Sequence, residues 1–532
     1  MGGASGRNGA CAVDPGYGPL AVTVGSAHLD DAGADDSGGL AVNLDYSLLV
    51  PEFLLALAGV VVLLADTFRG ELKSGRQLLP WLTVFGAALY GATGAAAGSM
   101  TSEFAGIFAV DAFTAFFRVL FAVTLVVVVV GSHEYVSKNI RHQGEFYTML
   151  LFATVGASFM AGARELLTAY VGIELLSFSL YVAVSLAKSD SRSGEAGLKY
   201  VLLGGLASAT LLYGLSLVYG AGGSTSYVEI AKNLEHVEGL RMPLVLGLVM
   251  VIAGVGFKAS AVPFHMWTPD AYEGAPLPVT AILSATSKAA AFALILRLFS
   301  GPFLPVIGEW RTTIAILSLS TMVVGNLIAL QQTNIKRLLA YSSIAQVGYM
   351  LMAVVTMSDV SASALLLHMG GYLVTNLAVF MGVIAFYNHS NTEEISGLHG
   401  LAETNPFLAM VLAAGLLSLS GMPLLAGFTT KFILFQAAAS GGYLWLVTLA
   451  VIMSTISLFY YLKVIRQMYV VLPDGSQLPY ATEPSVRQER WSMSPSSTLV
   501  VSVLFLGIVV VGLYVAPLAV AADNAARALF KA

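Results

Sequence analysis

Four charged residues lie inside long apolar runs, where a charge is costly. They are Glu174, Lys258, Lys288 and Lys431. A charged side chain at the centre of a bilayer costs about 2.5–3.5 kcal/mol on insertion scales, so several in one chain indicate a use that compensates the cost. A lysine in a low dielectric holds its proton less tightly than in water, and a nearby Glu–Lys pair that opens and closes changes that hold. The residue types therefore indicate proton transfer controlled by an electrostatic switch.

A structural interpretation competes with this one. Intramembrane ions are usually paired, so each of these charges could serve only to lock two helices together. One acidic residue against three lysines favours the functional interpretation, because two of the lysines would lack a partner within the set.

The composition is typical of a membrane protein. Of 532 residues, 57% are hydrophobic and 11% charged, and mean hydropathy is +0.79, whereas soluble domains carry about 25% charged residues. The net charge of -5 provides no excess of positive charge to neutralise phosphates, which argues against a nucleic-acid-binding function. Cys11 is the only cysteine, so the chain cannot supply the four thiolates of an iron–sulfur cluster. No metal-ligand cluster or nucleotide-binding loop is recognisable, and we expect any redox group on another polypeptide.

About fourteen apolar runs are long enough to cross a membrane. They are 47 to 66, 78 to 98, 108 to 131, 146 to 163, 165 to 187, 197 to 220, 243 to 266, 276 to 300, 312 to 331, 337 to 357, 361 to 387, 406 to 438, 443 to 468 and 497 to 520. We expect residues 1–46, rich in Gly, Ala and Asp, to form a polar, acidic head outside the membrane. It lacks the basic start and apolar core of a cleaved signal peptide.

The distribution of Lys and Arg predicts the orientation. Odd-numbered loops hold about fourteen of these residues, and the tails and even-numbered loops about seven; such residues stay preferentially in the cytoplasm. Both termini should therefore face outward from a bacterial cell membrane.

Two of the runs contain helix breakers beside a lysine. The seventh continues from Lys258 into Pro263-Phe-His-Met-Trp-Thr-Pro-Asp270, and the twelfth holds Gly421 and Pro423 before Lys431. Discontinuous helices in corresponding positions of two halves indicate an ion pathway between inverted repeats; ordinary proline kinks are the alternative. His265 lies at the first break. A histidine there is equally compatible with a role as a proton relay and with a purely structural role as a hydrogen-bonded polar group.

Four further polar residues lie in or beside spans. His368 is a weaker relay candidate in the eleventh span. Arg297, near the end of the eighth, is interpreted as an anchor that reaches the interface. Glu52, at the start of the first span, predicts an interfacial or partner contact, and Arg118 in the third has no assigned role.

Several stretches resemble one known family. They are Gly256–Pro276, Ser287–Phe292, Asn334–Ala345 and Ser420–Lys431. They are similar to subunit N of bacterial proton-pumping NADH:quinone oxidoreductase (respiratory complex I), in the antiporter-like family that also includes large subunits of Mrp-type antiporters. The resemblance covers about residues 47–520. Gln346 departs from it, because relatives often have a histidine there, and the head is longer than the family needs.

The resemblance implies an all-α fold of about fourteen transmembrane helices. Three helices (47–131) would precede two inverted five-helix repeats (146–300 and 312–468), each with one discontinuous helix, and a last helix (497–520) would follow. It implies that Glu174 is the family's key glutamate in the fifth span and that Lys258 is the lysine of the broken seventh span. Lys288 would be the central lysine in the eighth span, and Lys431 the lysine of the twelfth. A lysine at the last position favours subunit N over subunit M, and no long lateral helix follows as in subunit L.

The implied function is proton translocation coupled to electron transfer from NADH to quinone on other subunits. Quinone reduction would be felt at a Glu174–Lys258 pair and passed to Lys288 and Lys431, with waters and His265 bridging. The resemblance implies no cofactor on this chain, FMN and iron–sulfur clusters on partner subunits, and contacts with the lipid bilayer, subunit M, subunit K and the lateral helix of subunit L. An Mrp-type cation/proton antiporter without redox coupling and a passive scaffold are the alternatives. The quinone type, the proton stoichiometry and Na⁺ transport stay open.

Overall fold

The computed structural model describes, apart from Gly2, residues 45–69, 78–99, 101–235, 241–470 and 490–531. The chain divides into residues 1–43 and 44–532, and the fold described here is that of the second unit. Cys11 and nearly all of the expected head lie outside the described residues.

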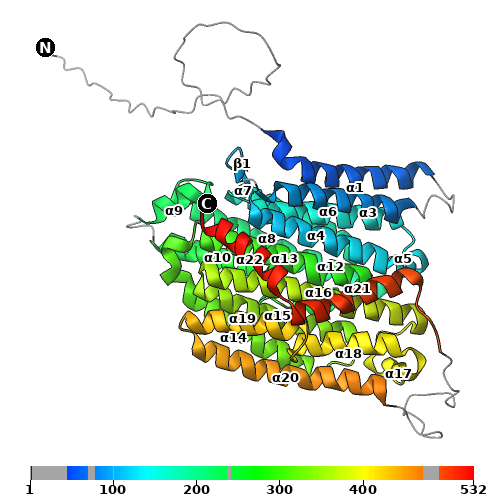
Figure 1. Cartoon of the computed structure of the whole chain (residues 1–532). Coiled ribbons are helices and arrows are strands. Elements are labelled where there is room, and N and C mark those ends of the chain that lie inside the picture. Colours follow the sequence, from blue (N-terminus) through cyan, green and yellow to red (C-terminus); the bar gives the residue numbers. More distant parts are fainter. Residues whose placement is uncertain are drawn as a thin grey trace. The chain divides into compact units, whose positions relative to one another are not determined.

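The second unit is a bundle of long helices that lie side by side (Figure 1). Its first part contains η1 (Tyr46–Leu49), α1 (Val50–Arg69), α3 (Leu78–Ala96), η2 (Ala97–Ser99), α4 (Ala112–Gly131), α5 (His133–Asn139), α6 (Gln143–Gly162), α7 (Leu166–Val184), α8 (Ser191–Gly222), α9 (Tyr227–Leu234), α10 (Arg241–Ala259), α11 (Trp267–Gly274), α12 (Leu277–Ile282), the π-helical turn η3 (Leu283–Ser287) and α13 (Lys288–Ser300). Its second part contains η4 (Leu304–Val306), α14 (Ile307–Ala329), α15 (Ile335–Thr356), α16 (Asp359–Ser390), η5 (Ile395–Leu398), α17 (Leu401–Thr404), α18 (Pro406–Ser420), α19 (Ala426–Ser440), α20 (Leu444–Tyr469), α21 (Pro495–Leu513) and α22 (Ala516–Lys531).

Thirteen helices of the described chain are long and apolar enough to cross a membrane. The run expected at 406 to 438 is divided, as its helix breakers predict, into α18 and α19, two helices of 15 residues each. The helical, multi-pass membrane fold predicted from composition is therefore confirmed, with the twelfth run present as two short helices.

Polar residues at helix ends define several of the spans. Asn334 caps α15 by accepting hydrogen bonds from the backbone N–H groups of Lys336 and Arg337. Asp111 caps α4 through Thr114 N at 2.8 Å. Such caps satisfy backbone donors that have no partner inside the helix, which is most important where water is excluded.

A short β-hairpin links α3 to α4 and was not predicted. Strands β1 (Ser102–Phe104) and β2 (Phe108–Val110) pair antiparallel. Phe108 is buried in a small apolar cluster with Leu49 and Phe104. The sequence interpretation merged this segment with the third span, because Phe108, Ala109 and Val110 are as apolar as the helix that follows.

Three spans form the centre of the bundle. The span Leu277–Ser300 contains α12, η3 and α13. The most apolar 18-residue stretch of this span is fully buried, as is that of α15, and that of α16 is 94% buried. The corresponding stretches of α8, α20 and α21 are only 28% buried. The central spans therefore position polar side chains away from lipid, and the outer spans face the surroundings.

Candidate functional site

The first predicted break separates α10 from α11. The helix ends at Ala259, directly after Lys258, and Ser260 has a positive φ of 72°. Local contacts replace the missing helical hydrogen bonds: Trp267 Nε1 donates to Phe257 O at 2.8 Å, and Val262 N donates to Thr321 Oγ1 at 2.9 Å. The break therefore places Lys258 at a helix carboxyl terminus, where the helix dipole favours a cation.

Lys258 and Glu174 each bind a serine. Lys258 Nζ donates to Ser177 Oγ at 2.9 Å, and Glu174 accepts a hydrogen bond from Ser208 Oγ of α8. Glu174 and Ser177 are three residues apart on α7 and so share one helix face. The charged atoms of Glu174 and Lys258 form no ion pair within 4.0 Å. The direct pair that the resemblance implies is thus open, with each partner bound to a serine.

Lys288 is the first residue of α13 and directly follows the π-helical turn η3. Its side chain is 1% exposed, and Nζ donates to Ser343 Oγ of α15. The ring of Tyr272 lies 5.9 Å from the same nitrogen, and its hydroxyl lies 3.4 Å from Ser343 Oγ. π-Helical turns are frequent at functional sites, but neither hydropathy nor residue type in this stretch predicts one.

The second break separates α18 from α19, as the glycine and proline there predict. Gly421 has a φ of 92° and ends α18. Lys431, on α19, is buried, and its Nζ donates to Leu419 O at 2.6 Å and to Ser454 Oγ at 3.4 Å. Leu419 belongs to the last turn of α18, whose carbonyls lack helical partners. Interruption of the helix therefore supplies the oxygen that holds the lysine.

Gln346 connects the centre of the bundle to the second break. On α15 it follows Ser343, the partner of Lys288, by three residues. Its Nε2 donates to Leu419 O at 3.1 Å, so Gln346 and Lys431 share one carbonyl. Gln346 cannot act as the titratable relay that a histidine would provide at this position. Its neutral amide instead joins α15 to α18 through a hydrogen bond.

The two histidines differ in their surroundings. His265 is buried in the segment between α10 and α11 but makes no hydrogen bond to Lys258, Lys288 or Lys431 in the described chain. His368 Nδ1 lies 3.0 Å from Thr430 Oγ1, and Thr430 directly precedes Lys431. His368, the weaker candidate in sequence, is therefore hydrogen-bonded to the residue that precedes Lys431, whereas His265 has no described hydrogen bond to any of the three lysines.

Glu52 is not an interfacial residue, which corrects its sequence interpretation. It is 2% exposed and forms a two-point ion pair with Arg118, with Nε and Nη2 each 2.8 Å from a carboxylate oxygen. Ser158 of α6 donates to Glu52 Oε1 at 2.5 Å, and Tyr90 of α3 donates to Ser158 Oγ at 2.9 Å. Arg118, left without a role in sequence, therefore connects α4 to α1 within a four-helix polar cluster.

The interpretation of Arg297 as an interfacial anchor is also wrong. Its side chain is 2% exposed, and Nη2 lies 2.8 Å from Asp111 Oδ1, while Nε donates to Ala161 O at 2.9 Å. Arg297 thus ties α13 to α4 and to the end of α6. Asp111, an acidic residue at the start of the third span, could have indicated a buried partner for Arg297. The sequence gives no reason, however, to pair two positions that lie 186 residues apart.

The buried charges fall into two groups. Arg118, Arg297 and Lys336 each form an ion pair with a carboxylate, Lys336 with Glu393 at 2.7 Å. Lys258, Lys288 and Lys431 form none within 4.0 Å in the described chain and are held by serine hydroxyl and backbone carbonyl oxygens. This chemistry permits each lysine to be charged or neutral without leaving a carboxylate uncompensated.

Comparison with known proteins identifies the relatives. Residues 163–457 match the family model described as NADH:quinone oxidoreductase/Mrp antiporter, TM. NADH-quinone oxidoreductase subunit N of Moorella thermoacetica is 41% identical over 83% of this chain and 92% of its own length. The chain belongs to this family. The subunit N of Heliobacterium modesticaldum is 40% identical over 92% of this chain and all of its own length.

Two solved structures share the fold. A chain of respiratory complex I from Thermus thermophilus with bound aureothin matches at 31% identity and a TM-score of 0.71, covering 88% of this chain and 98% of its own. A chain of the Mrp complex from Dietzia matches at 20% identity and a TM-score of 0.76, over 91% of this chain and 97% of its own. The second likeness establishes the fold alone.

The family match contains every candidate proton group. Glu174, Lys258, Lys288 and Lys431 lie within residues 163–457, as does His265, and so do both helix breaks. Within the described chain no group of three His, Cys, Asp or Glu residues is arranged to hold a metal ion.

Proposed function

We propose that this chain is subunit N of a bacterial NADH:quinone oxidoreductase and moves protons across the membrane as one part of that enzyme complex. The observation that carries the proposal is the group of three buried lysines without ionic partners, in a protein that pairs its buried arginines. Ion pairs that only lock helices together would be satisfied in the way Arg118 and Arg297 are, so the structural interpretation fits the lysines poorly.

In the proposed cycle, the Glu174–Lys258 contact closes and opens. Ser208 and Ser177 are the partners of these groups in the open form. Closing the contact stabilises a positive charge on Lys258 and disfavours one on Lys288. A proton released from Lys288 moves toward Lys431, with waters carrying it past Gln346, whose amide does not titrate.

The two breaks provide the ends of this path. Lys258 lies at the end of α10 and Lys431 follows the break between α18 and α19. We assign residues 146–300 and 312–468 to two inverted repeats, each containing one break. His265, at the first break, remains the candidate for a water-mediated relay, and both termini are proposed to face outward.

The proposed partners follow the family assignment. FMN and iron–sulfur clusters would lie on other subunits, and this chain would hold no cofactor. Subunits M and K and the lateral helix of subunit L are its proposed neighbours. The likeness to an Mrp complex chain concerns the fold, and no described contact favours exchange of ions without redox coupling over the proposed function.

A mild-detergent pull-down of the tagged chain tests the assignment. Co-elution with flavin- and cluster-bearing subunits, together with NADH:quinone activity in the eluate, is expected. Elution alone, or with small membrane subunits and no NADH oxidation, would contradict the proposal and call for cation/proton exchange assays.

A further inference from the structure

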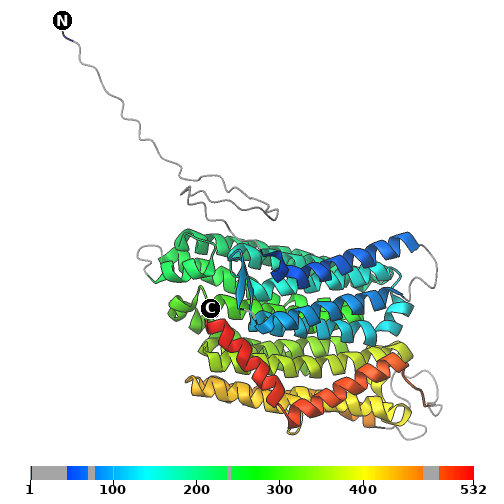
Figure 2. The same cartoon turned by 45° about the horizontal axis from the view of Figure 1, so that its top comes forward.

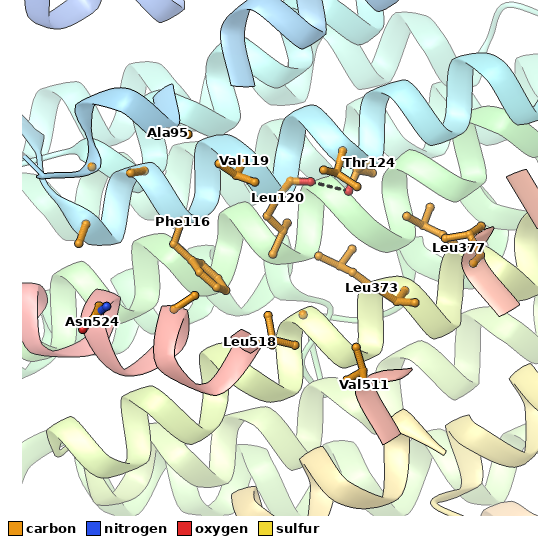
Figure 3. Close-up of a pocket in the computed structure, with 18 residues that line it drawn as sticks. Ala95, Phe116, Val119, Leu120, Thr124, Leu373, Leu377, Val511, Leu518 and Asn524 are labelled. Carbon is orange, nitrogen blue, oxygen red and sulfur yellow. Dashed lines mark hydrogen bonds between the residues drawn. The ribbon is translucent and has the colours of Figure 1, made fainter. Parts of the chain in front are cut away.

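An apolar groove on the bundle is lined by none of the three lysines. Its volume is about 580 Å³, and its walls are α3, α4, α16, α21 and α22. Figure 3 shows Phe116, Leu120, Leu373 and Leu518 directed into it. Helix α22 closes one side because it turns away from α21 and crosses the bundle obliquely (Figure 2).

The lining of the groove is almost wholly apolar. Thr124 and Asn524 are its two polar residues. The Thr124 hydroxyl is occupied, since it donates to Leu120 O at 2.8 Å. Four of the five walls belong to spans long enough to cross the membrane, so the groove lies at the depth of the hydrocarbon. Water would gain few hydrogen bonds there, whereas hydrocarbon would restore dispersion contacts to the lining.

The length of the groove distinguishes between possible occupants. Along α4 its lining runs from Ala112 to Thr124, which is about 18 Å at 1.5 Å per residue. One leaflet of a bilayer is about 15 Å deep, half of the roughly 30 Å hydrocarbon core. A transmembrane helix of a partner would need a groove of the full thickness. The groove therefore fits an acyl chain that reaches from a headgroup to the midplane.

A second apolar groove runs beside the first. It has a volume of about 270 Å³ and is lined by α3 and α4. Val119 and Val123 of α4 border both grooves and are 39% and 54% exposed. They form a ridge with one groove on each side, which is the arrangement that the two acyl chains of one phospholipid require.

Polar and basic groups lie at one end of the larger groove. In Figure 3, Asn524 lies at the end near Phe116, opposite Leu377 and Thr124. Arg527 follows Asn524 by three residues and so shares its helix face. Helix α22 carries Arg527 and Lys531 against Asp523, a net charge of one positive unit, and Arg527 is ion-paired with Asp523 at 2.7 Å. The Arg527 side chain is 62% exposed, so the N–H groups that this pair leaves over, together with the Asn524 amide, can donate to a phosphate at this end of the groove.

We propose that a single phospholipid binds this site, with its acyl chains on either side of the Val119–Val123 ridge and its phosphate beside Asn524 and Arg527. None of the proposed proton-transfer residues lines this site, and nothing in it rests on the proposed redox function.

Photo-crosslinking tests the site in the intact complex. The complex is placed in phosphatidylcholine vesicles containing a trace of phosphatidylglycerol with a diazirine in one acyl chain, and labelled residues are mapped by mass spectrometry. We expect labelling at Leu373 and Leu377 to exceed that at Leu506, a lipid-facing residue of α21 outside the groove, by about tenfold, which corresponds to about 1.4 kcal/mol of preference. Unlabelled phosphatidylglycerol should compete for groove labelling only.

Two matched tryptophan variants complete the test. Val123→Trp places a ring on the ridge and should abolish groove labelling. Val503→Trp, at a position 57% exposed on α21 that does not line the groove, should leave it unchanged. Equal labelling of the groove and Leu506 in the unsubstituted complex would overturn the proposal, as would a groove protected from the probe by a partner polypeptide. The competition experiment needs no variant and keeps the test valid if Val123→Trp fails to assemble.

Discussion

Replacing Lys258 by methionine should stop proton movement through this subunit and leave the protein folded, whereas the same replacement of Arg297 should destabilise it. Both side chains are buried, and methionine occupies a similar path without the charge. Lys258 Nζ has one hydrogen bond, to Ser177, and no ion pair within 4.0 Å. Loss of that hydrogen bond costs about 0.5–1.5 kcal/mol, and removal of a buried cation offsets part of the cost.

Arg297 is different because a carboxylate depends on it. Its guanidinium donates to Asp111 Oδ1, Thr114 Oγ1 and Ala161 O at 2.8–2.9 Å. Methionine would leave Asp111 buried without its cation, which costs about 3–5 kcal/mol. The two variants should thus differ in unfolding free energy by about 2–4 kcal/mol, a factor of roughly 30 to 1,000 in the unfolding equilibrium.

The assay compares assembly with pumping. Each variant complex is purified in mild detergent for thermal unfolding, and inverted membrane vesicles report NADH-driven acidification beside NADH oxidation. Lys258→Met should retain near-normal stability with a reduced ratio of protons to NADH, and Arg297→Met should lose stability first. A Lys258→Met complex as unstable as Arg297→Met, or one that pumps at the normal ratio, would refute the reasoning.

Three further outcomes follow from the same contacts. Glu174→Gln keeps an acceptor for Ser208 but removes the charge that the proposed switch requires, so vesicle acidification should fall while the complex stays assembled; unchanged acidification would count against the switch. Gln346→Leu removes one neutral hydrogen bond to Leu419 O, worth about 1 kcal/mol, and should slow proton movement by about fivefold, whereas Gln346→His keeps a donor and should slow it less. Glu52→Gln or Arg118→Met alone should each destabilise the protein by about 3–5 kcal/mol, while the double variant should recover most of that loss in thermal unfolding; additive losses would show that the pair is not coupled.

Residue types alone predicted the elements of the site. A charge inside an apolar run is conspicuous, and glycine or proline beside it predicts an interrupted helix, so the sequence alone places Lys258 and Lys431 at breaks. The partners of these lysines could not be found in this way. Serine is common in membrane helices, and the contacts of Ser177 and Ser343 join residues 81 and 55 positions apart.

The errors have a single physical origin. Glu52 and Arg297 lie near the ends of spans, where hydropathy allows a side chain to reach water. Whether the side chain reaches water depends on what packs over that end of the span. Here Arg118 pairs with Glu52, and Asp111 pairs with Arg297, inside the bundle. The hairpin of β1 and β2 was missed for a similar reason, because three apolar residues before a helix have the same hydropathy as the helix.

The Asp111–Arg297 pair has a consequence for synthesis of the chain. Its partners are 186 residues apart, so the carboxylate at the start of α4 enters the membrane long before its cation is made. At about 5–20 residues per second the ribosome needs roughly 10–40 s to cover that distance. During this interval the first three spans carry an uncompensated acid, and a chaperone or membrane protease has time to engage them. Docking of α13 then supplies the cation, so the pair can form only after the eighth span has been made.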